Sequence, residues 1–259
     1  MVDATVDSGA GQEPPTVTIG GFKVAALDRQ AAARSIIEGA SARRGRPLYF
    51  TSINGEVIAR ADMDKNIAKL FSSADQILAD GQPLVLASRF LCRMALPERV
   101  ATTDLFHDVA RMAERSGSTF YMFGADETEN RKAVAAVRKA YPRLNIVGHS
   151  HGYLGGALLE DKLDEINRLA PDILWLGLGV PLEQKFVLDF AHRLPDVGLI
   201  KTSGGLFNFL SGKNSRAPGW MQRAGFEWLW RTLLEPRRLF WRYLTTNPRA
   251  LYAILRHSK

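Results

Sequence analysis

The stretch from residue 171 to residue 181, Pro-Asp-Ile-Leu-Trp-Leu-Gly-Leu-Gly-Val-Pro, says most about the fold. Its apolar residues, 173–178, stand at consecutive positions instead of alternating with polar ones. A strand of this kind is buried on both faces, as in a parallel sheet between two layers of helices. Gly177 and Gly179 stand near its end, where the backbone can approach a phosphate in front of a helix.

Similar runs recur along the chain and alternate with amphipathic stretches. The short apolar runs are 48–51, 119–123, 145–147, 173–178 and 198–202. The stretches with helical spacing include 104–116, 128–141, 158–169 and 182–194. This alternation predicts crossover units and therefore an α/β fold with a mostly parallel sheet. Ahead of it, residues 16–20 and 22–26 flank Gly20-Gly21 and predict a hairpin, followed by a helix over 28–40.

Polar and glycine-rich segments follow the apolar runs. They are residues 51–56, 79–82, 124–126, 177–184 and 203–205. In an open α/β sheet, ligands bind outside the carboxyl ends of the strands. Loops collect such residues for other reasons, so a single segment decides nothing. Five of them at one edge of a sheet predict a ligand site there.

The composition argues against a disulfide-stabilised protein and against a membrane-spanning one. The chain has 259 residues, 46% of them hydrophobic, and a single cysteine, Cys92, so no disulfide within the chain can form. No segment approaches the roughly 20 apolar residues that span a bilayer. Residues 1–15 lack the basic start and apolar run of a signal peptide and predict a disordered lead. We therefore expect a cytoplasmic protein.

The last 47 residues differ from the rest. Residues 213–259 contain ten Lys or Arg residues and two Glu residues, together with four of the five Trp residues of the chain. We expect an α/β core over 16–212 and a helical, basic, aromatic C-terminal appendage over 213–259. Its helices are predicted at 220–233, 236–244 and 248–255, because Pro236 and Pro248 stand where helices begin.

Three kinds of partner fit the appendage. Trp and Tyr favour the headgroup region of a membrane, Lys and Arg meet anionic lipids, and Arg binds diphosphates in a bidentate manner. A protein interface remains an alternative. A nucleic-acid surface fits less well, because this aromatic density comes without a recognisable binding module. The sequence therefore predicts that the appendage binds the inner membrane surface or a diphosphate, and that it does not bind nucleic acid.

An Asp-x-Asp pair, Asp62 and Asp64, has the spacing of many metal sites in glycosyltransferases. It lies inside the stretch 57–71, whose apolar residues recur at helical spacing. Residues two apart on a helix do not face each other, so the two carboxylates would not meet on one ion. The sequence predicts no metal site here.

The order of motifs matches a known family. The C-terminal motifs are Arg216-Ala-Pro218-Gly-Trp220, Glu227-Trp228-Leu-Trp-Arg231 and Glu235-Pro236-Arg237-Arg238. The earlier ones are Ser52-Ile-Asn54, Ala79-Asp80-Gly81, Gly177-Leu-Gly179 and Gly204-Gly205. With these motifs, residues 16–243 resemble the WecG/TagA/CpsF glycosyltransferases, glycosyltransferase family 26. The resemblance implies a Rossmann-like domain and an appendage that completes the site at the membrane.

The resemblance also implies a reaction. It is an inverting, metal-independent transfer from a UDP-sugar to a sugar on a polyprenyl diphosphate, in cell-surface polysaccharide synthesis and without a cofactor. Asp80 falls on the catalytic base, which takes the acceptor proton. Cationic groups would stabilise the departing diphosphate. The residues expected to bind substrate are Thr51, Ser52, Asn54, Arg99, Gly177, Gly179, Gln184, Gly204, Gly205, Arg216, Arg231, Arg237 and Arg238.

Some positions depart from the family's pattern, and some alternatives stay open. Glu183 and Gln184 stand in exchanged order, and Asn208 replaces a frequent Asp, so the donor preference and these roles stay open. A soluble nucleotide-dependent oxidoreductase is one rival, although the third glycine of its fingerprint is missing. A non-catalytic membrane adaptor is another. The oligomeric state, a homo-oligomer included, is also open.

Overall fold

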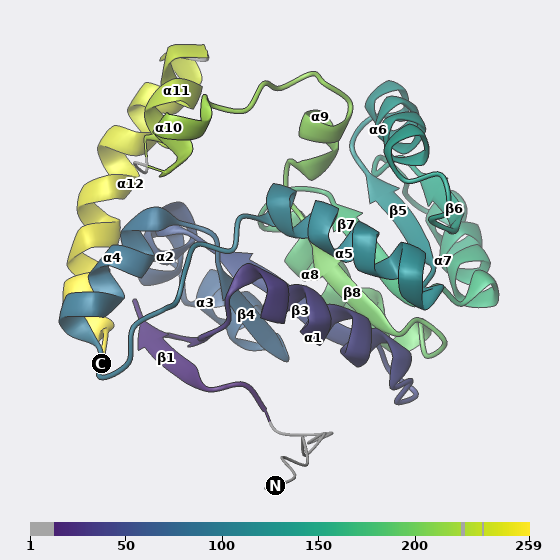
Figure 1. Ribbon diagram of the computed structural model, residues 1–259, viewed down its shortest axis with the longest axis horizontal. Helices are drawn as coiled ribbons and strands as arrows, with labels where there is room; N and C mark the ends of the chain where they lie inside the picture. The colour runs from purple at the N-terminus through teal and green to yellow at the C-terminus, as the bar shows by residue number, and fades with distance from the viewer. Residues whose placement is uncertain (1–12, 224–225, 235) are drawn as a thin grey trace, which may run out of the picture.

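The computed structural model describes residues 13–223, 226–234 and 236–259, which form a three-layer α/β/α sandwich (Figure 1). Residues 1–12 of the predicted lead lie outside that range. The central sheet has the strand order β4-β3-β8-β7-β5-β6, and all its strand pairs are parallel. The strands are β3 (Leu48–Ile53), β4 (Gln76–Ala79), β5 (Phe120–Gly124), β6 (Ile146–Ser150), β7 (Ile173–Gly177) and β8 (Leu199–Thr202). The predicted parallel sheet is confirmed.

Helices cover both faces of this sheet. One layer consists of α1 (Arg29–Ser41), α5 (Thr102–Ser116), α6 (Glu127–Ala140) and α9 (Leu206–Leu210). The other consists of α2 (Gly55–Met63), α3 (Lys65–Ser72), α7 (Ala157–Leu169) and α8 (Leu182–Phe190), which a short 3-10 turn (Ala191–Arg193) follows. On β7, Trp175 packs into the first layer, whereas Leu174 and Leu176 pack into the second. The consecutive apolar residues are thus buried on alternate faces, as the sequence predicted.

The predicted N-terminal hairpin is also confirmed. Strands β1 (Thr16–Ile19) and β2 (Phe22–Ala25) pair antiparallel across a two-residue turn. Gly20 and Gly21 occupy that turn with φ of 56° and 86°. Both values lie in the left-handed region that glycine adopts without strain, which is what a tight hairpin turn of this hand requires.

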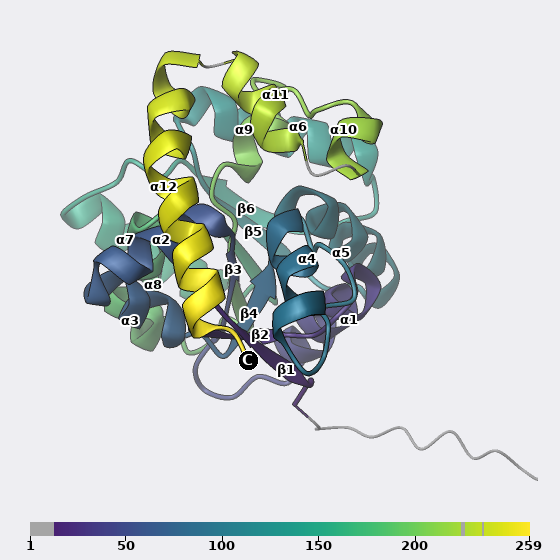
Figure 2. The same ribbon diagram turned by 90° about the vertical axis from the view of Figure 1, so that its left-hand side faces the viewer.

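The C-terminal helices differ from the expectation. They are α10 (Gly219–Arg223), α11 (Glu227–Leu234) and the long α12 (Pro236–His257), with α4 (Gln82–Leu91) beside α12 (Figure 2). The prediction of a new helix at Pro248 was wrong, because α12 continues through it. A proline inside a helix removes one backbone hydrogen bond. Packing beyond the proline compensates, since Ala250, Ala253 and Ile254 are buried.

The end of the chain returns to its beginning. The backbone N–H of Gly21 donates to the carbonyl of His257 over 2.9 Å, and that of Lys259 donates to the carbonyl of Thr18 over 3.0 Å. Ile254 packs in one cluster with the hairpin, α2 and α4. The boundary at Gly212 stays a prediction about domains. In the structure, the end of α12 shares the core of the residues before that boundary.

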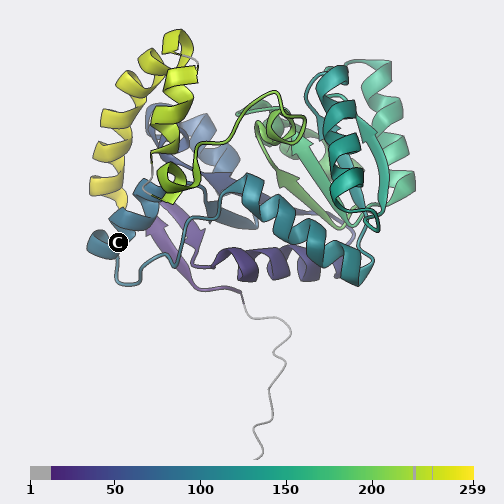
Figure 3. The same cartoon turned by 45° about the horizontal axis from the view of Figure 1, so that its top comes forward.

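The appendage helices stand at one end of the sheet, and α6 and α7 stand at the other (Figure 3). Among helices of the described ranges, none is both long and apolar enough to cross a membrane.

The burial of Ile254 gives a stability test. Ile254 is 4% exposed and its neighbour Leu255 is 59% exposed. We expect Ile254→Ala to lower the free energy of unfolding by about 2–5 kcal/mol, the usual cost of such a core truncation. Leu255→Ala is the matched control and should stay within about 0.5 kcal/mol of the wild type. Urea unfolding measures both, and equal stabilities would show that α12 is not part of the core.

Candidate active site

The carboxyl ends of neighbouring strands gather the predicted polar segments. β3 lies between β4 and β8, and β7 lies beyond β8. The segments after these strands hold Asn54, Asp80, Gly179 and Gly204. The backbone N–H of Asp80 donates to the carbonyl of Ile53 over 2.8 Å, which places the end of β4 against the end of β3. The predicted convergence at one edge of the sheet is observed.

Two residues hold the carboxylate of Asp80, one at each of its oxygens. Its Oδ1 accepts from Arg99 Nη2 over 3.2 Å, and its Oδ2 accepts from the backbone N–H of Thr102 over 3.1 Å. Thr102 is the first residue of α5, so the carboxylate also lies at the positive end of a long helix dipole. Donors on both oxygens fix the carboxylate in place, and its remaining lone pairs can still accept a proton.

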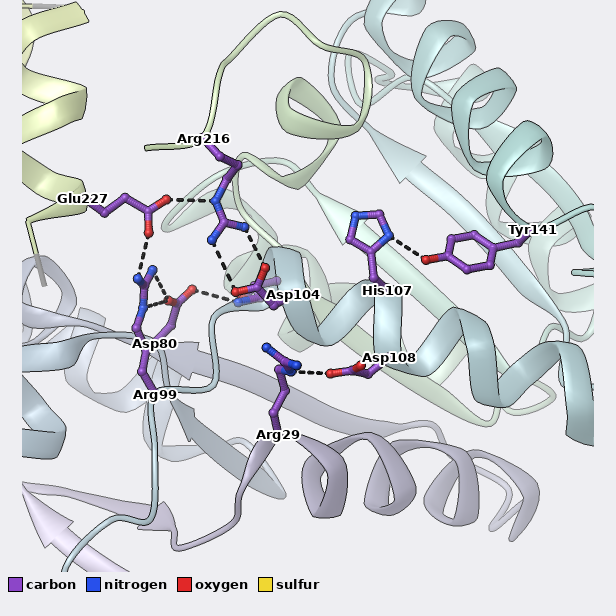
Figure 4. A network of polar contacts seen from close by, with 10 residues as sticks. Arg29, Asp80, Arg99, Asp104, His107, Asp108, Tyr141, Arg216 and Glu227 are labelled. Carbon is purple, nitrogen blue, oxygen red and sulfur yellow. Dashed lines mark hydrogen bonds and ion pairs between the residues drawn. The ribbon is translucent and has the colours of Figure 1, made fainter. Parts of the chain in front are cut away.

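A polar network joins Asp80 to the C-terminal segment (Figure 4). Arg99 Nη1 donates to Glu227 over 2.7 Å, and Glu227 lies 3.0 Å from Arg216 Nε. Arg216 in turn donates to Asp104 over 3.0 and 3.3 Å. Burial alone would lower the pKa of the Arg99 guanidinium, but the carboxylates of Asp80 and Glu227 together raise it. The arginine is therefore a permanent cation beside Asp80.

A cavity of about 380 Å³ opens next to the end of β7. Its lining includes Gly177, Tyr153 and Phe186. A side chain on Gly177 would collide with the ring of Phe207, whose Cδ2 atom lies 2.4 Å from the Cβ position, so the close packing of Phe207 requires a glycine there. Tyr153 is 80% exposed at the rim. An aromatic face beside a bare backbone suits a planar base with an attached phosphate.

The two aspartates of the Asp-x-Asp pair have separate partners. The prediction that both lie within one helical stretch was wrong, because the chain breaks at Asp64 between α2 and α3. Asp64 caps α3 by accepting from the backbone N–H of Asn66 over 2.8 Å, while Asp62 forms an ion pair with Arg249 of α12. Within the described ranges, no group of three His, Cys, Asp or Glu residues is arranged to hold a metal ion.

Comparison with known proteins decides the family. A family model described as "Glycosyl transferase WecG/TagA/CpsF family" matches residues 17–259. The chain belongs to this family. A Bacillus subtilis (strain 168) protein named N-acetylglucosaminyldiphosphoundecaprenol N-acetyl-beta-D-mannosaminyltransferase is 31% identical over 213 residues, 81% of this chain and 80% of the relative. A Staphylococcus aureus (strain MRSA252) protein of the same name is 25% identical over 194 residues, 74% of each chain.

In this WecG/TagA/CpsF glycosyltransferase, several residues expected from the sequence line the same edge. Ser52 and Asn54 stand at the end of β3, and Asn54 caps α2 by accepting from the backbone N–H of Val57 over 3.1 Å. Gly179, with φ of 79°, precedes α8. Gly204 donates its backbone N–H to buried Glu183 over 2.9 Å, and Gly205 caps α9.

Two other expected residues, Thr51 and Gln184, are buried and do not face this edge. Thr51 is fully buried and its hydroxyl accepts from that of Thr202 over 2.7 Å, because neighbouring residues of a strand face opposite sides. Gln184 is buried and donates to Glu183 over 3.2 Å. Arg237 is exposed near the start of α12. The side chains of Arg231 and Arg238 lie outside the described residues.

Some site residues were missed by sequence reasoning. Glu227, Thr102 and Asp104 connect the base, the arginines and the C-terminal segment, yet none stands at a strand end. Lys201 donates to Ser52 from inside β8. A signal for the lysine was present, since a charged residue interrupts the apolar run 198–202.

The contacts of Glu227 with Arg99 and Arg216 are expected to hold α11 against the core. The Glu227 carboxylate is 12% exposed and meets two guanidinium groups, and hydrogen bonds to charged groups contribute about 1.5–3 kcal/mol each. We expect Glu227→Gln to speed amide hydrogen exchange in α11 about tenfold or more, because the helix loses its charged contact with the core. Hydrogen-exchange mass spectrometry measures this.

The control is Glu160→Gln, which removes the exposed ion pair with Arg193 on the other side of the molecule. It should leave α11 unchanged. Unaltered exchange in the Glu227 variant would show that the bridge does not hold the helix.

Proposed function

We propose that this protein is an inverting, metal-independent glycosyltransferase that moves a sugar from a UDP-sugar to a saccharide on a polyprenyl diphosphate. The observation that carries the proposal is Asp80, fixed by Arg99 and Thr102 at the carboxyl edge of the sheet in a member of this family. The relatives' names specify an undecaprenol diphosphate acceptor and an N-acetylmannosaminyl group. We take over the acceptor class and leave the sugar open.

The proposed step needs one base and one departing anion. The acceptor hydroxyl oxygen attacks the anomeric carbon of the donor from the side opposite to UDP, and Asp80 takes the hydroxyl proton. The bond from the anomeric carbon to the diphosphate oxygen breaks, and its electron pair leaves with UDP. Attack from the opposite side inverts the anomeric configuration.

Several features support a donor site that runs from the cavity beside Gly177 to the arginines near Asp80. The cavity beside Gly177 and Tyr153 has the size and the aromatic rim that a nucleoside needs. The diphosphate would then lie toward Arg99 and Arg216, which supply positive charge without a metal. Asp62 and Asp64 are engaged in an ion pair and a helix cap, so they are not poised to hold a metal at the donor.

We also propose that the appendage docks on the inner face of the cell membrane. Trp220 on α10 and Trp241 on α12 are 61% and 66% exposed, and exposed leucines accompany them. The segment is also strongly basic. Exposed aromatics with cationic neighbours suit the headgroup region of an anionic bilayer, where the lipid-linked acceptor would lie.

This surface can be tested with vesicles. We expect Trp220→Ser with Trp241→Ser to weaken binding to vesicles containing anionic lipid about tenfold or more, because two aromatic contacts with the interface are lost. Co-sedimentation measures the binding. Leu158→Ser, at an equally exposed site on α7, is the control and should bind like the wild type. Equal binding by all three chains would exclude this surface.

The catalytic base gives the decisive test of function. Asp80→Asn should lower the transfer rate about 10²–10⁴-fold, because the amide cannot take the acceptor proton. Release of UDP with a lipid-linked acceptor in the presence of EDTA measures the rate. Both Asp80 oxygens face donors, so thermal unfolding and UDP binding must confirm that the variant is folded.

The outcomes separate the rival functions. Turnover of the variant within threefold of the wild type would remove Asp80 from catalysis. A membrane adaptor would release no UDP with any acceptor, and an oxidoreductase would be retained on NAD resin instead of UDP resin. Loss of wild-type activity in EDTA, restored by Mg²⁺, would contradict the metal-independent mechanism.

A further inference from the structure

Lys201 is a charged residue inside the sheet. It is fully buried in β8, and its neighbours across the sheet are Phe50 of β3 and Trp175 of β7. An ammonium group among aromatic side chains is costly unless its donors are bonded and its charge is balanced. The transfer step proposed above makes no use of this residue.

The lysine reaches toward the edge where the strands end. Its Nζ donates to the carbonyl of Thr202 over 2.8 Å and to Oγ of Ser52 over 3.0 Å. Ser52 stands two residues beyond Phe50 on β3, and residues two apart on a strand point to the same face. Ser52 is partly exposed whereas Lys201 is not. The serine hydroxyl is therefore the group through which the lysine can act on a ligand.

The hydroxyl of Ser52 is forced to donate. Its oxygen accepts from Lys201 Nζ and also from the hydroxyl of Thr102 over 3.3 Å. A serine oxygen has two lone pairs and one proton, so both lone pairs are engaged and the proton is left to point elsewhere. The backbone N–H of Thr102 also bonds Asp80. An outward-facing donor thus stands beside the proposed catalytic base.

Charges on two sides act on the lysine. Burial lowers the pKa of Lys201 to about 8, and the carboxylates of Glu183 on α8 and Asp80 beyond β4 oppose that shift. Glu183 is itself buried, which raises its pKa, and it accepts from the backbone N–H of Gly204. An anion bound above Ser52 would add negative charge and favour the ammonium form further.

We propose, on the basis of the function proposed above, that Lys201 is a positioning residue of the donor site. It orients the hydroxyl of Ser52 as a hydrogen-bond donor to an anionic oxygen of the UDP-sugar diphosphate. Lys201 does not touch the donor. Its charge strengthens the bond, because a hydroxyl that accepts from an ammonium group becomes a better donor itself.

Calorimetric titration with UDP and with uridine tests this role. Lys201→Met should lose about tenfold in affinity for UDP, the effect of one hydrogen bond to a charged group. Its affinity for uridine, which has no diphosphate, should stay unchanged. The double variant with Ser52→Ala should bind UDP no more weakly than Ser52→Ala alone, because the lysine acts through the serine. Lys139→Met, at an exposed lysine on α6, is the control and should bind both like the wild type.

The pH dependence of the affinity for UDP separates this role from a merely structural one, because a lysine that only stabilised the fold would not change that dependence. Bound UDP favours the ammonium form, so the affinity of the wild type for UDP should fall as the pH rises above about 8, where the free protein loses that proton. The affinity of Lys201→Met should change much less over the same range. Arginines remain charged throughout and cannot produce this fall.

Each outcome decides a different claim. A folded Lys201→Met chain that binds UDP as tightly as the wild type overturns the inference and leaves the proposed function intact. A wild-type chain that binds no UDP contradicts the proposed function and removes the inference with it. If thermal unfolding shows that Lys201→Met does not fold, Ser52→Ala carries the test. That variant must lose both the affinity and its fall above about pH 8, and persistence of the fall overturns the inference.

Discussion

Helices cover both faces of the parallel sheet, and this burial controls where polar chemistry can occur. A side chain that must meet a polar ligand has to stand where a strand ends, because both faces are filled with apolar residues. Ser52, Asp80 and Gly204 satisfy this constraint by their positions along the chain. Lys201 satisfies it differently. It lies inside the sheet and extends a long side chain to the edge, where it bonds Ser52.

Electrostatic balance then joins distant parts of the chain. Arg99 balances the carboxylate of Asp80 and also binds Glu227, which lies 128 residues further along the chain. Glu227 reaches Arg216 as well, so one carboxylate on α11 holds two guanidinium groups near the base. The position of α11 is thus joined to the site by charge.

Local patterns predicted the elements whose causes are local. The consecutive apolar residues of β7 predicted a doubly buried strand, and Gly20 with Gly21 predicted a hairpin turn. Prediction failed where tertiary packing overrode a local preference. Pro248 favours a helix start, but burial of the residues after it keeps α12 continuous. The break at Asp64 could not be read from the apolar spacing, which runs on through both helices.

The sequence by itself determined the fold class and the edge of the sheet at which the polar segments gather. Those conclusions depend on the order of residues along single segments, and hydrophobic periodicity records that order directly. Asp80 became the candidate base through the resemblance of its motif to the family. Tertiary structure alone decided which side chains face the edge. It buried Thr51 and Gln184, brought Glu227 to Arg99, and placed Lys201 beneath Ser52. These outcomes depend on strand register and on contacts between residues far apart in the chain, which no local pattern specifies.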